Sequence, residues 1–79
     1  MKILVVDDEK FIRQGIKYML EEDIKDIQVI VANNGFEALD RMLNHNVDII
    51  ITDIKMPIMD GITLISEIRK KYADVPIFV

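Results

Sequence analysis

The segment "IITDIKMPIMDG", residues 50–61, sets a single aspartate directly after a run of β-branched residues. Asp53 ends that apolar run, and a turn that contains Pro57 and Gly61 follows it. A short continuous run of this kind is typical of a strand buried on both faces, as in a parallel sheet. Because packing does not explain a charge at that point, we interpret the segment as a strand that brings Asp53 to the rim of a sheet.

The same kind of strand recurs along the chain and alternates with helical patterns. The predicted strands are residues 3–6, 27–32, 47–53 and 76–79. The predicted helices run from residue 10 to about 22, from the turn at 33–35 to about 43, and from the end of the 54–61 loop to about 72. Strands that alternate with such helices predict right-handed crossovers, so we expect a flavodoxin-like, doubly wound parallel α/β sheet in the order β-α-β-α-β-α-β.

Helical spacing also predicts which side chains of each helix face the sheet. In the first helix these are Phe11, Ile12, Ile16, Met19 and Leu20, with Arg13, Gln14 and Lys17 on the other side. In the second helix they are Phe36, Leu39, Met42 and Leu43. In the third helix they are Leu64, Ile65, Ile68 and Tyr72.

Length and composition limit what the chain does. Its 79 residues suggest one domain, residues 1–79, and its formal net charge of −4 argues against nucleic-acid binding, which needs clustered Lys and Arg. The absence of cysteine excludes a disulfide or a thiolate metal site, and no stretch approaches the ~18 apolar residues of a membrane helix. We therefore expect a cytoplasmic domain that binds neither nucleic acid nor membrane through this segment.

Acidic residues close two of the predicted strands. Asp7 and Asp8 follow the first strand and Asp53 follows the third, and these strands are adjacent in a 2-1-3-4-5 strand order. The three carboxylates would then converge at the carboxyl edge of the sheet, where a cation relieves the repulsion of like charges. Oxygen-only ligands favour a hard divalent ion, and Mg²⁺ beside a lone aspartate indicates phosphoryl chemistry with Asp53 as the nucleophile.

Each of these features also has a purely structural interpretation. An acidic pair after a strand often caps the next helix, as Asp8 or Glu9 would here, and a lone aspartate often only ends a strand. The combination of both motifs on the first and third strands favours function. For the remaining polar features we prefer the structural interpretation: His45 belongs to a surface connection, and "RKK" at 69–71 to the last turn of a helix.

Three segments, "ILVVDDE", "NGFEAL" and "DIIITDIKMPIMDG", resemble the receiver domain of bacterial two-component response regulators. The resemblance implies a CheY-like fold in which Asp53 accepts a phosphoryl group from a phosphohistidine on a sensor histidine kinase. It also implies that Pro57 and Gly61 shape the loop after the phosphoacceptor. The implied ligands of Mg²⁺ are Asp8, Asp53, the main-chain carbonyl of Lys55 and, through water, Asp7.

The family's pattern is incomplete in this sequence. Receivers carry a Ser or Thr at the end of the fourth strand and a Lys at the end of the fifth, and both positions would fall after Val79. We therefore expect the N-terminal portion of a receiver domain, truncated in the fourth strand. The unfinished apolar strand predicts self-association, by edge pairing or by exchange of elements between identical chains, or else poor folding, rather than a stable monomer.

The resemblance therefore implies a phosphoacceptor that acts through an output domain outside this segment, with control of transcription as the expected output. Such a domain is not an enzyme, beyond catalysing its own phosphorylation. A haloacid-dehalogenase-like phosphohydrolase is the alternative, although that class places a second Asp two residues after its nucleophile, where this chain has Lys55. A receiver fragment that serves as an assembly module without chemistry is the third hypothesis.

Overall fold

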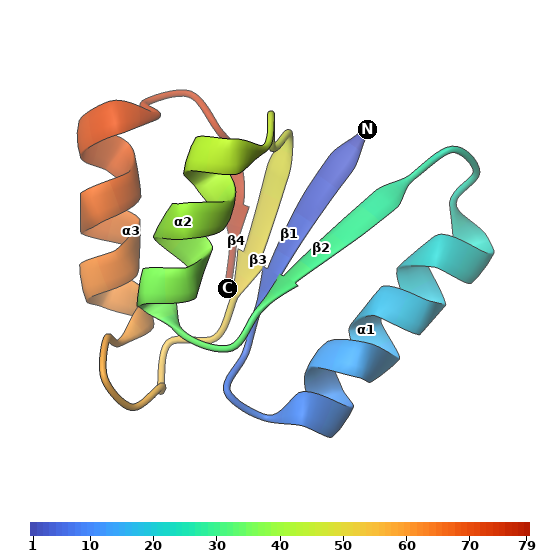
Figure 1. The fold of residues 1–79 in the computed structure, drawn as a ribbon, viewed down its shortest axis with the longest axis horizontal. Coiled ribbons are helices and arrows are strands. Elements are labelled where there is room, and N and C mark those ends of the chain that lie inside the picture. The colour runs from blue at the N-terminus through green and yellow to red at the C-terminus, as the bar shows by residue number, and fades with distance from the viewer.

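A computed structural model describes residues 1–79 as four parallel strands and three helices (Figure 1). The strands are β1 (Lys2–Val6), β2 (Gln28–Ala32), β3 (Ile49–Thr52) and β4 (Ile77–Phe78). The helices are α1 (Lys10–Asp23), α2 (Gly35–Asn44) and α3 (Gly61–Lys71). The strand order is β2-β1-β3-β4. The predicted flavodoxin-like, doubly wound fold class is therefore confirmed.

The two central strands end side by side. Val6 of β1 lies opposite Thr52 of β3 in the parallel register. The ladder continues one residue further, because the Asp53 amide donates to the Val6 carbonyl oxygen over 3.2 Å. The Asp7 amide likewise donates to the carbonyl oxygen of Ala32, at the end of β2, over 3.2 Å. The backbones of Asp7 and Asp53 are therefore both fixed to the carboxyl edge of the sheet.

The helices divide unequally between the two faces of the sheet. In Figure 1, α2 and α3 lie together on one side of the strands and α1 lies on the other. The larger core cluster lies under α2 and α3 and includes Leu4, Ile50 and Leu64, all fully buried. The smaller cluster contains Ile3, Val5 and Val29, against which α1 packs with Ile16 and Leu20 among other partly buried residues.

The predicted inner face of α1 is partly wrong. Phe11, Ile12 and Met19 are 89%, 47% and 56% exposed, respectively. Arg13 and Lys17, expected outside, are half-buried instead. The half-buried stripe consists of residues 13, 16, 17 and 20, the i, i+3, i+4, i+7 pattern of a helical face. Basic side chains fit there because their stems cover apolar surface while their polar ends reach main-chain oxygens.

The second helix shows the same kind of correction. Phe36 and Leu43 of α2 are 59% and 64% exposed, although both were expected to face the sheet. The buried residues of α2 are Gly35, Ala38 and Met42, two of them small. Small side chains let the helix backbone approach the strands closely, which turns the bulkier residues outward.

The third helix packs as predicted in its centre. Leu64 and Ile68 are fully buried, and Tyr72, just after the helix, is half-buried against the same core. None of the three helices combines the length and the apolar character that crossing a bilayer requires.

Candidate functional site

Three carboxylates meet at the carboxyl edge of the sheet. Asp7, Asp8 and Asp53 each offer one oxygen, and these oxygens lie within 4.8 Å of one another. The adjacency of β1 and β3 brings together residues that are far apart in the sequence. Three carboxylate oxygens are the type of ligand that Mg²⁺ prefers, so the donor set fits this ion. A cation would also offset the repulsion among three closely spaced negative charges.

Asp7 is the most constrained of the three acids. Its side chain is buried, and its Oδ1 atom accepts a hydrogen bond from the Glu9 amide over 2.9 Å. Its main-chain oxygen accepts a second hydrogen bond from Arg13 Nη1 over 2.8 Å. One carboxylate oxygen of Asp7 is therefore committed to the loop, whereas Asp8 and Asp53 reach solvent.

Asp53 combines a fixed backbone with an open side chain. Its amide is held by the Val6 carbonyl oxygen, and its own carbonyl oxygen accepts a hydrogen bond from the Thr52 hydroxyl over 3.0 Å. Thr52 is only 2% exposed, so this contact is shielded from water. The Asp53 side chain projects into solvent from this rigid position. A carboxylate held in this way is accessible to a reactant, while the backbone that carries it stays fixed to the sheet.

The loop after Asp53 folds back on the start of α3. The Gly61 amide donates to the Ile54 carbonyl oxygen over 2.7 Å. A Cβ atom at Gly61 would collide with the main-chain oxygen of Asp53 and lie 2.7 Å from the Ile54 Cα atom. Met56 is buried and anchors the loop in the core, whereas Lys55, two residues after Asp53, is exposed. Gly61 is thus the residue type that the close approach requires.

The same loop also touches the start of α2. A Cβ atom at Gly35 would lie 2.5 Å from Met59 Sδ and 2.8 Å from Met59 Cβ. At the loop's tip, Pro57 is exposed and Ile58 adopts a positive φ of 72°. The loop is therefore held at both ends, with a strained residue between them.

Two helices begin with side-chain caps near this edge. The Asn34 side chain accepts from the Glu37 amide over 2.9 Å, in agreement with the predicted cap at the 33–35 turn. The Asp60 side chain accepts from the Thr63 amide over 2.7 Å. This hydrogen bond holds the pKa of the Asp60 carboxyl below its ordinary value. Glu9 occupies the N-cap position of α1, yet its side chain makes no capping hydrogen bond.

The other polar features lie away from the acids. His45 is the C-cap residue of α2, and Arg69, Lys70 and Lys71 occupy the last turn of α3, as expected. Both positions are at the end of a helix remote from the carboxyl edge of the sheet. Neither contributes to the acidic cluster.

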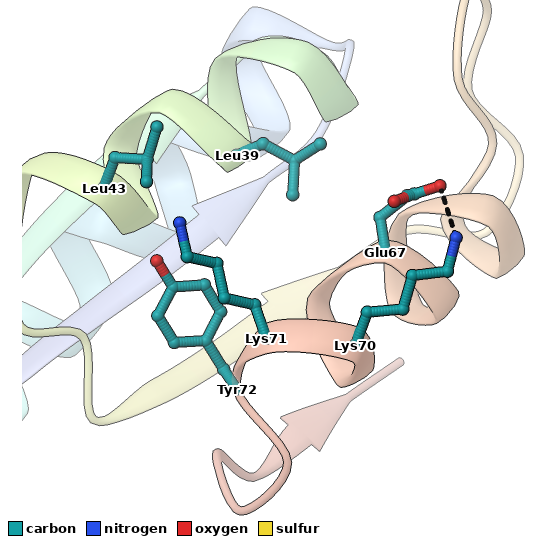
Figure 2. Close-up of a pocket in the computed structure, with 6 residues that line it drawn as sticks. All are labelled: Leu39, Leu43, Glu67, Lys70, Lys71 and Tyr72. Carbon is teal, nitrogen blue, oxygen red and sulfur yellow. Dashed lines mark hydrogen bonds and ion pairs between the residues drawn. The ribbon is translucent and has the colours of Figure 1, made fainter.

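A hollow lies between α2 and α3 (Figure 2). It has a volume of about 280 Å³ and lies toward the C-terminal ends of both helices, opposite the acids. Its lining residues are Leu39, Leu43, Glu67, Lys70, Lys71 and Tyr72. Figure 2 shows Glu67 paired with Lys70, over 3.2 Å, and Lys71 beside the Tyr72 ring. The polar residues of the hollow are separate from the group of Asp7, Asp8 and Asp53, so the candidate site remains the acidic edge.

Sequence reasoning missed the contact between Arg13 and Asn33 at this edge. Arg13 Nη1 donates both to the Asp7 carbonyl oxygen and, over 2.9 Å, to Asn33 Oδ1. The signal was present in the sequence, because Arg13 shares a helical face with Ile16 and Leu20, which do pack on the sheet. The competing stripe of Phe11 and Met19 concealed it.

Comparison with known proteins gives a consistent family assignment. The sequence profile described as the response regulator receiver domain matches residues 3–79. A protein-glutamate methylesterase/protein-glutamine glutaminase of Pseudoalteromonas atlantica is 46% identical over 71 residues, which cover 89% of this chain and 18% of that protein. The chain thus spans less than a fifth of the length of this relative.

Solved structures agree with the sequence comparison. The response regulator TrrA from Thermotoga maritima in complex with Mg²⁺-BeF matches with a TM-score of 0.88 and 43% identity, over 96% of this chain and 64% of that chain. A complex of the histidine kinase ThkA with TrrA matches with a TM-score of 0.87 and 43% identity, over 96% of this chain and 64% of that chain.

Proposed function

The chain belongs to the family of response regulator receiver domains, and from this premise we propose that Asp53 is its phosphoacceptor. The observation that carries the proposal is the cluster of Asp7, Asp8 and Asp53, whose carboxylate oxygens lie within 4.8 Å of one another. Among the three, Asp53 alone joins an exposed carboxylate to a backbone fixed on both sides, by Val6 and Thr52.

The reaction is a phosphoryl transfer from a histidine to an aspartate. A carboxylate oxygen of Asp53 attacks the phosphorus atom, and a new P–O bond forms. The P–N bond of the donor phosphohistidine breaks, and the imidazole leaves with the electron pair. The protein's part is to hold the attacking oxygen in line with the leaving nitrogen, which the fixed Asp53 backbone favours.

We propose that Asp8, Asp53 and the main-chain carbonyl of Lys55 hold Mg²⁺, with Asp7 acting through water. The buried Asp7 side chain already accepts the Glu9 amide, which suits an indirect role. Bound Mg²⁺ would neutralise charge on the phosphoryl oxygens during transfer. A neighbouring structure, TrrA, is a complex with Mg²⁺-BeF, which supports the same ion here.

The proposed donor is a sensor histidine kinase, since TrrA also forms a complex with the histidine kinase ThkA. We further propose that the phosphorylated domain controls an output carried by another domain, with transcription as the expected output. The phosphohydrolase alternative is disfavoured, because Lys55 stands two residues after Asp53, where that class needs its second Asp.

Phosphoryl uptake from a small donor tests this proposal. Incubation with acetyl phosphate and Mg²⁺ should raise the intact mass by one phosphoryl group, and chelation of Mg²⁺ should suppress the change. Asp53→Asn should remove it, whereas Asp74→Asn, which changes a remote exposed acid, should not. Uptake that persists in the Asp53→Asn variant would contradict the assignment.

A further inference from the structure

We infer that Arg13 is a positioning residue of the acidic site, which ties the loop after β1 to the loop after β2 and so fixes the direction of Asp8. The inference rests on the proposed function of that site. Its starting observation is that Arg13 Nη1 lies 2.8 Å from the Asp7 carbonyl oxygen and 2.9 Å from Asn33 Oδ1. A single nitrogen therefore bridges the two loops that border the carboxylates.

The Asp7 carbonyl controls how the chain enters Asp8. This carbonyl belongs to the planar peptide unit that also contains the amide and the Cα atom of Asp8. A hydrogen bond to the carbonyl oxygen therefore restricts the rotation of the whole unit. Because the donor is a guanidinium, the bond is stronger than one between neutral groups.

Asp8 depends on this restraint more than Asp7 does. Asp7 is also held through its amide, by the Ala32 carbonyl oxygen, and through its carboxylate, by the Glu9 amide. The Asp8 carboxylate makes no ion pair within the chain. The backbone therefore sets the point from which this side chain starts, and the Arg13 contact fixes the peptide unit immediately before it.

The fold itself has other supports at both ends of the bridge. The Asn33 amide donates to Glu37 Oε1 over 2.9 Å, and Asn34 caps α2, so the β2–α2 loop keeps its shape without Arg13. On the α1 side, Ile16 and Leu20 supply the apolar contact with the sheet. Loss of the guanidinium should therefore disturb the acidic site before it disturbs the fold.

Lys17 provides a matched control for Arg13. It lies one turn later on the same half-buried face of α1, and its Nζ reaches the Val29 carbonyl oxygen over 3.4 Å. Substitution by alanine at either position removes one positive charge and one contact to a main-chain oxygen. Only the contact of Arg13 lies in the loop that carries Asp7 and Asp8.

The test measures Mg²⁺ affinity by NMR titration of Arg13→Ala, Arg13→Lys, Lys17→Ala and the parent. We expect Arg13→Ala to weaken binding about 10-fold, the usual effect of losing a group that orients metal ligands. Arg13→Lys keeps the charge but not the planar fork, so we expect most of that loss to remain. Lys17→Ala should bind within about twofold of the parent, a change smaller than the expected loss.

A second readout needs no metal. In the Mg²⁺-free protein, the amides of Asp8 and Glu9 should exchange with solvent faster in Arg13→Ala and Arg13→Lys than in Lys17→Ala.

Full Mg²⁺ affinity in either Arg13 variant, or an equal loss of Mg²⁺ affinity in Arg13→Ala and Lys17→Ala, would overturn the inference. If Arg13→Ala does not fold, the Arg13→Lys comparison decides alone. A parent that binds no Mg²⁺ would overturn the proposed metal site and this inference with it, whereas a binding parent with unaffected variants would overturn the inference only.

Discussion

At the residue scale, Gly61 shows how closely the site depends on single atoms. Its Cα atom lies so near the main chain of Asp53 and Ile54 that any Cβ atom would have to displace backbone. Backbone atoms that are hydrogen-bonded in a sheet move away from an added Cβ atom less easily than the atoms of a flexible side chain. The absence of a side chain at position 61 therefore contributes directly to the placement of Asp53.

Gly61→Ala should lower the free energy of unfolding by about 1–3 kcal/mol, the usual cost of forcing extra atoms into a packed site. Gly15→Ala is the matched control, because nothing lies within 4 Å of its added Cβ atom. In the interior of α1 that change should stabilise the protein by roughly 0.5–1 kcal/mol. Urea denaturation measures both, and equal stability of Gly61→Ala and the parent would show that the loop adapts freely.

Asp8→Asn tests the contribution of one carboxylate to the proposed Mg²⁺ site. The change removes a charged ligand but keeps the size of the side chain, so Mg²⁺ affinity should fall roughly tenfold or more. Asp74→Asn changes the net charge equally at an exposed site in the connection to β4 and should leave the affinity unaltered. Calorimetric titration of the two variants provides the comparison. Unaltered binding by Asp8→Asn would show that the metal site lies elsewhere.

The three acids were predictable from the sequence, whereas the signal for Arg13 was ambiguous. Acids that directly follow two apolar strands can be placed as soon as those strands are placed, since strand ends share one edge of a parallel sheet. The direction of Arg13 depends instead on the rotation of α1 about its axis. Apolar residues stand on two sides of that helix, Phe11 on one and Leu20 on the other, and only packing against the sheet decides between them.

At the scale of the element, the cap of α3 makes a pH-dependent contribution. The Asp60 carboxylate accepts a hydrogen bond from the Thr63 amide, which lowers the Asp60 pKa from its ordinary value of 3.8. A lowered folded-state pKa means that the stabilisation is present above pH 3.8 and is lost as the pH falls through the folded value.

Asp60→Asn keeps a good capping side chain that does not titrate. Because only the parent has a charged cap at pH 7, it should have the higher Tm there. The difference in Tm between the two proteins should shrink as the pH falls below about 4, where the Asp60 carboxylate gains a proton. Thermal unfolding of both proteins over that pH range measures the difference. A difference that stays constant from neutral to acidic pH would mean that the cap carries no charge-dependent stabilisation.

The loop between β3 and α3 contains a residue that is poorly suited to its backbone. Ile58 has a φ of 72° and is 74% exposed, so it is strained and contributes little burial. Ile58→Asn should stabilise the protein by about 1 kcal/mol, because Asn tolerates the left-handed region far better than a β-branched residue. Ile62→Asn, at an exposed helical position, should not stabilise. Urea denaturation compares the two, and a less stable Ile58→Asn variant would contradict the account of strain.

Strand and helix bounds were predictable to within about two residues, because each change of hydrophobic period marks a boundary. Helix faces were less predictable. In α2 the small residues Gly35 and Ala38 face the sheet, while Phe36 and Leu43 remain exposed. Hydrophobicity alone ranks Phe and Leu above Gly and Ala, whereas close packing of a helix on strands favours the small side chains.

At the scale of the whole molecule, the strand order decides where the chemistry lies. The order β2-β1-β3-β4 puts β1 beside β3, so the acids that follow these strands share one edge although 45 positions separate Asp8 from Asp53. This topology was predictable from alternating strands and helices. The hollow between α2 and α3 was not, since it depends on how side chains such as Leu43 and Lys71 pack between two helices.

The most direct test of the central claim is to locate the phosphoryl group among the three clustered acids. The protein is phosphorylated with acetyl phosphate and Mg²⁺, the acyl phosphate is reduced with borohydride, and the peptides are sequenced by mass spectrometry. Reduction converts a phosphorylated aspartate to homoserine, which marks the position permanently. The account predicts homoserine at position 53 alone. Homoserine at position 7 or 8, or an unmodified position 53 in phosphorylated protein, would contradict it.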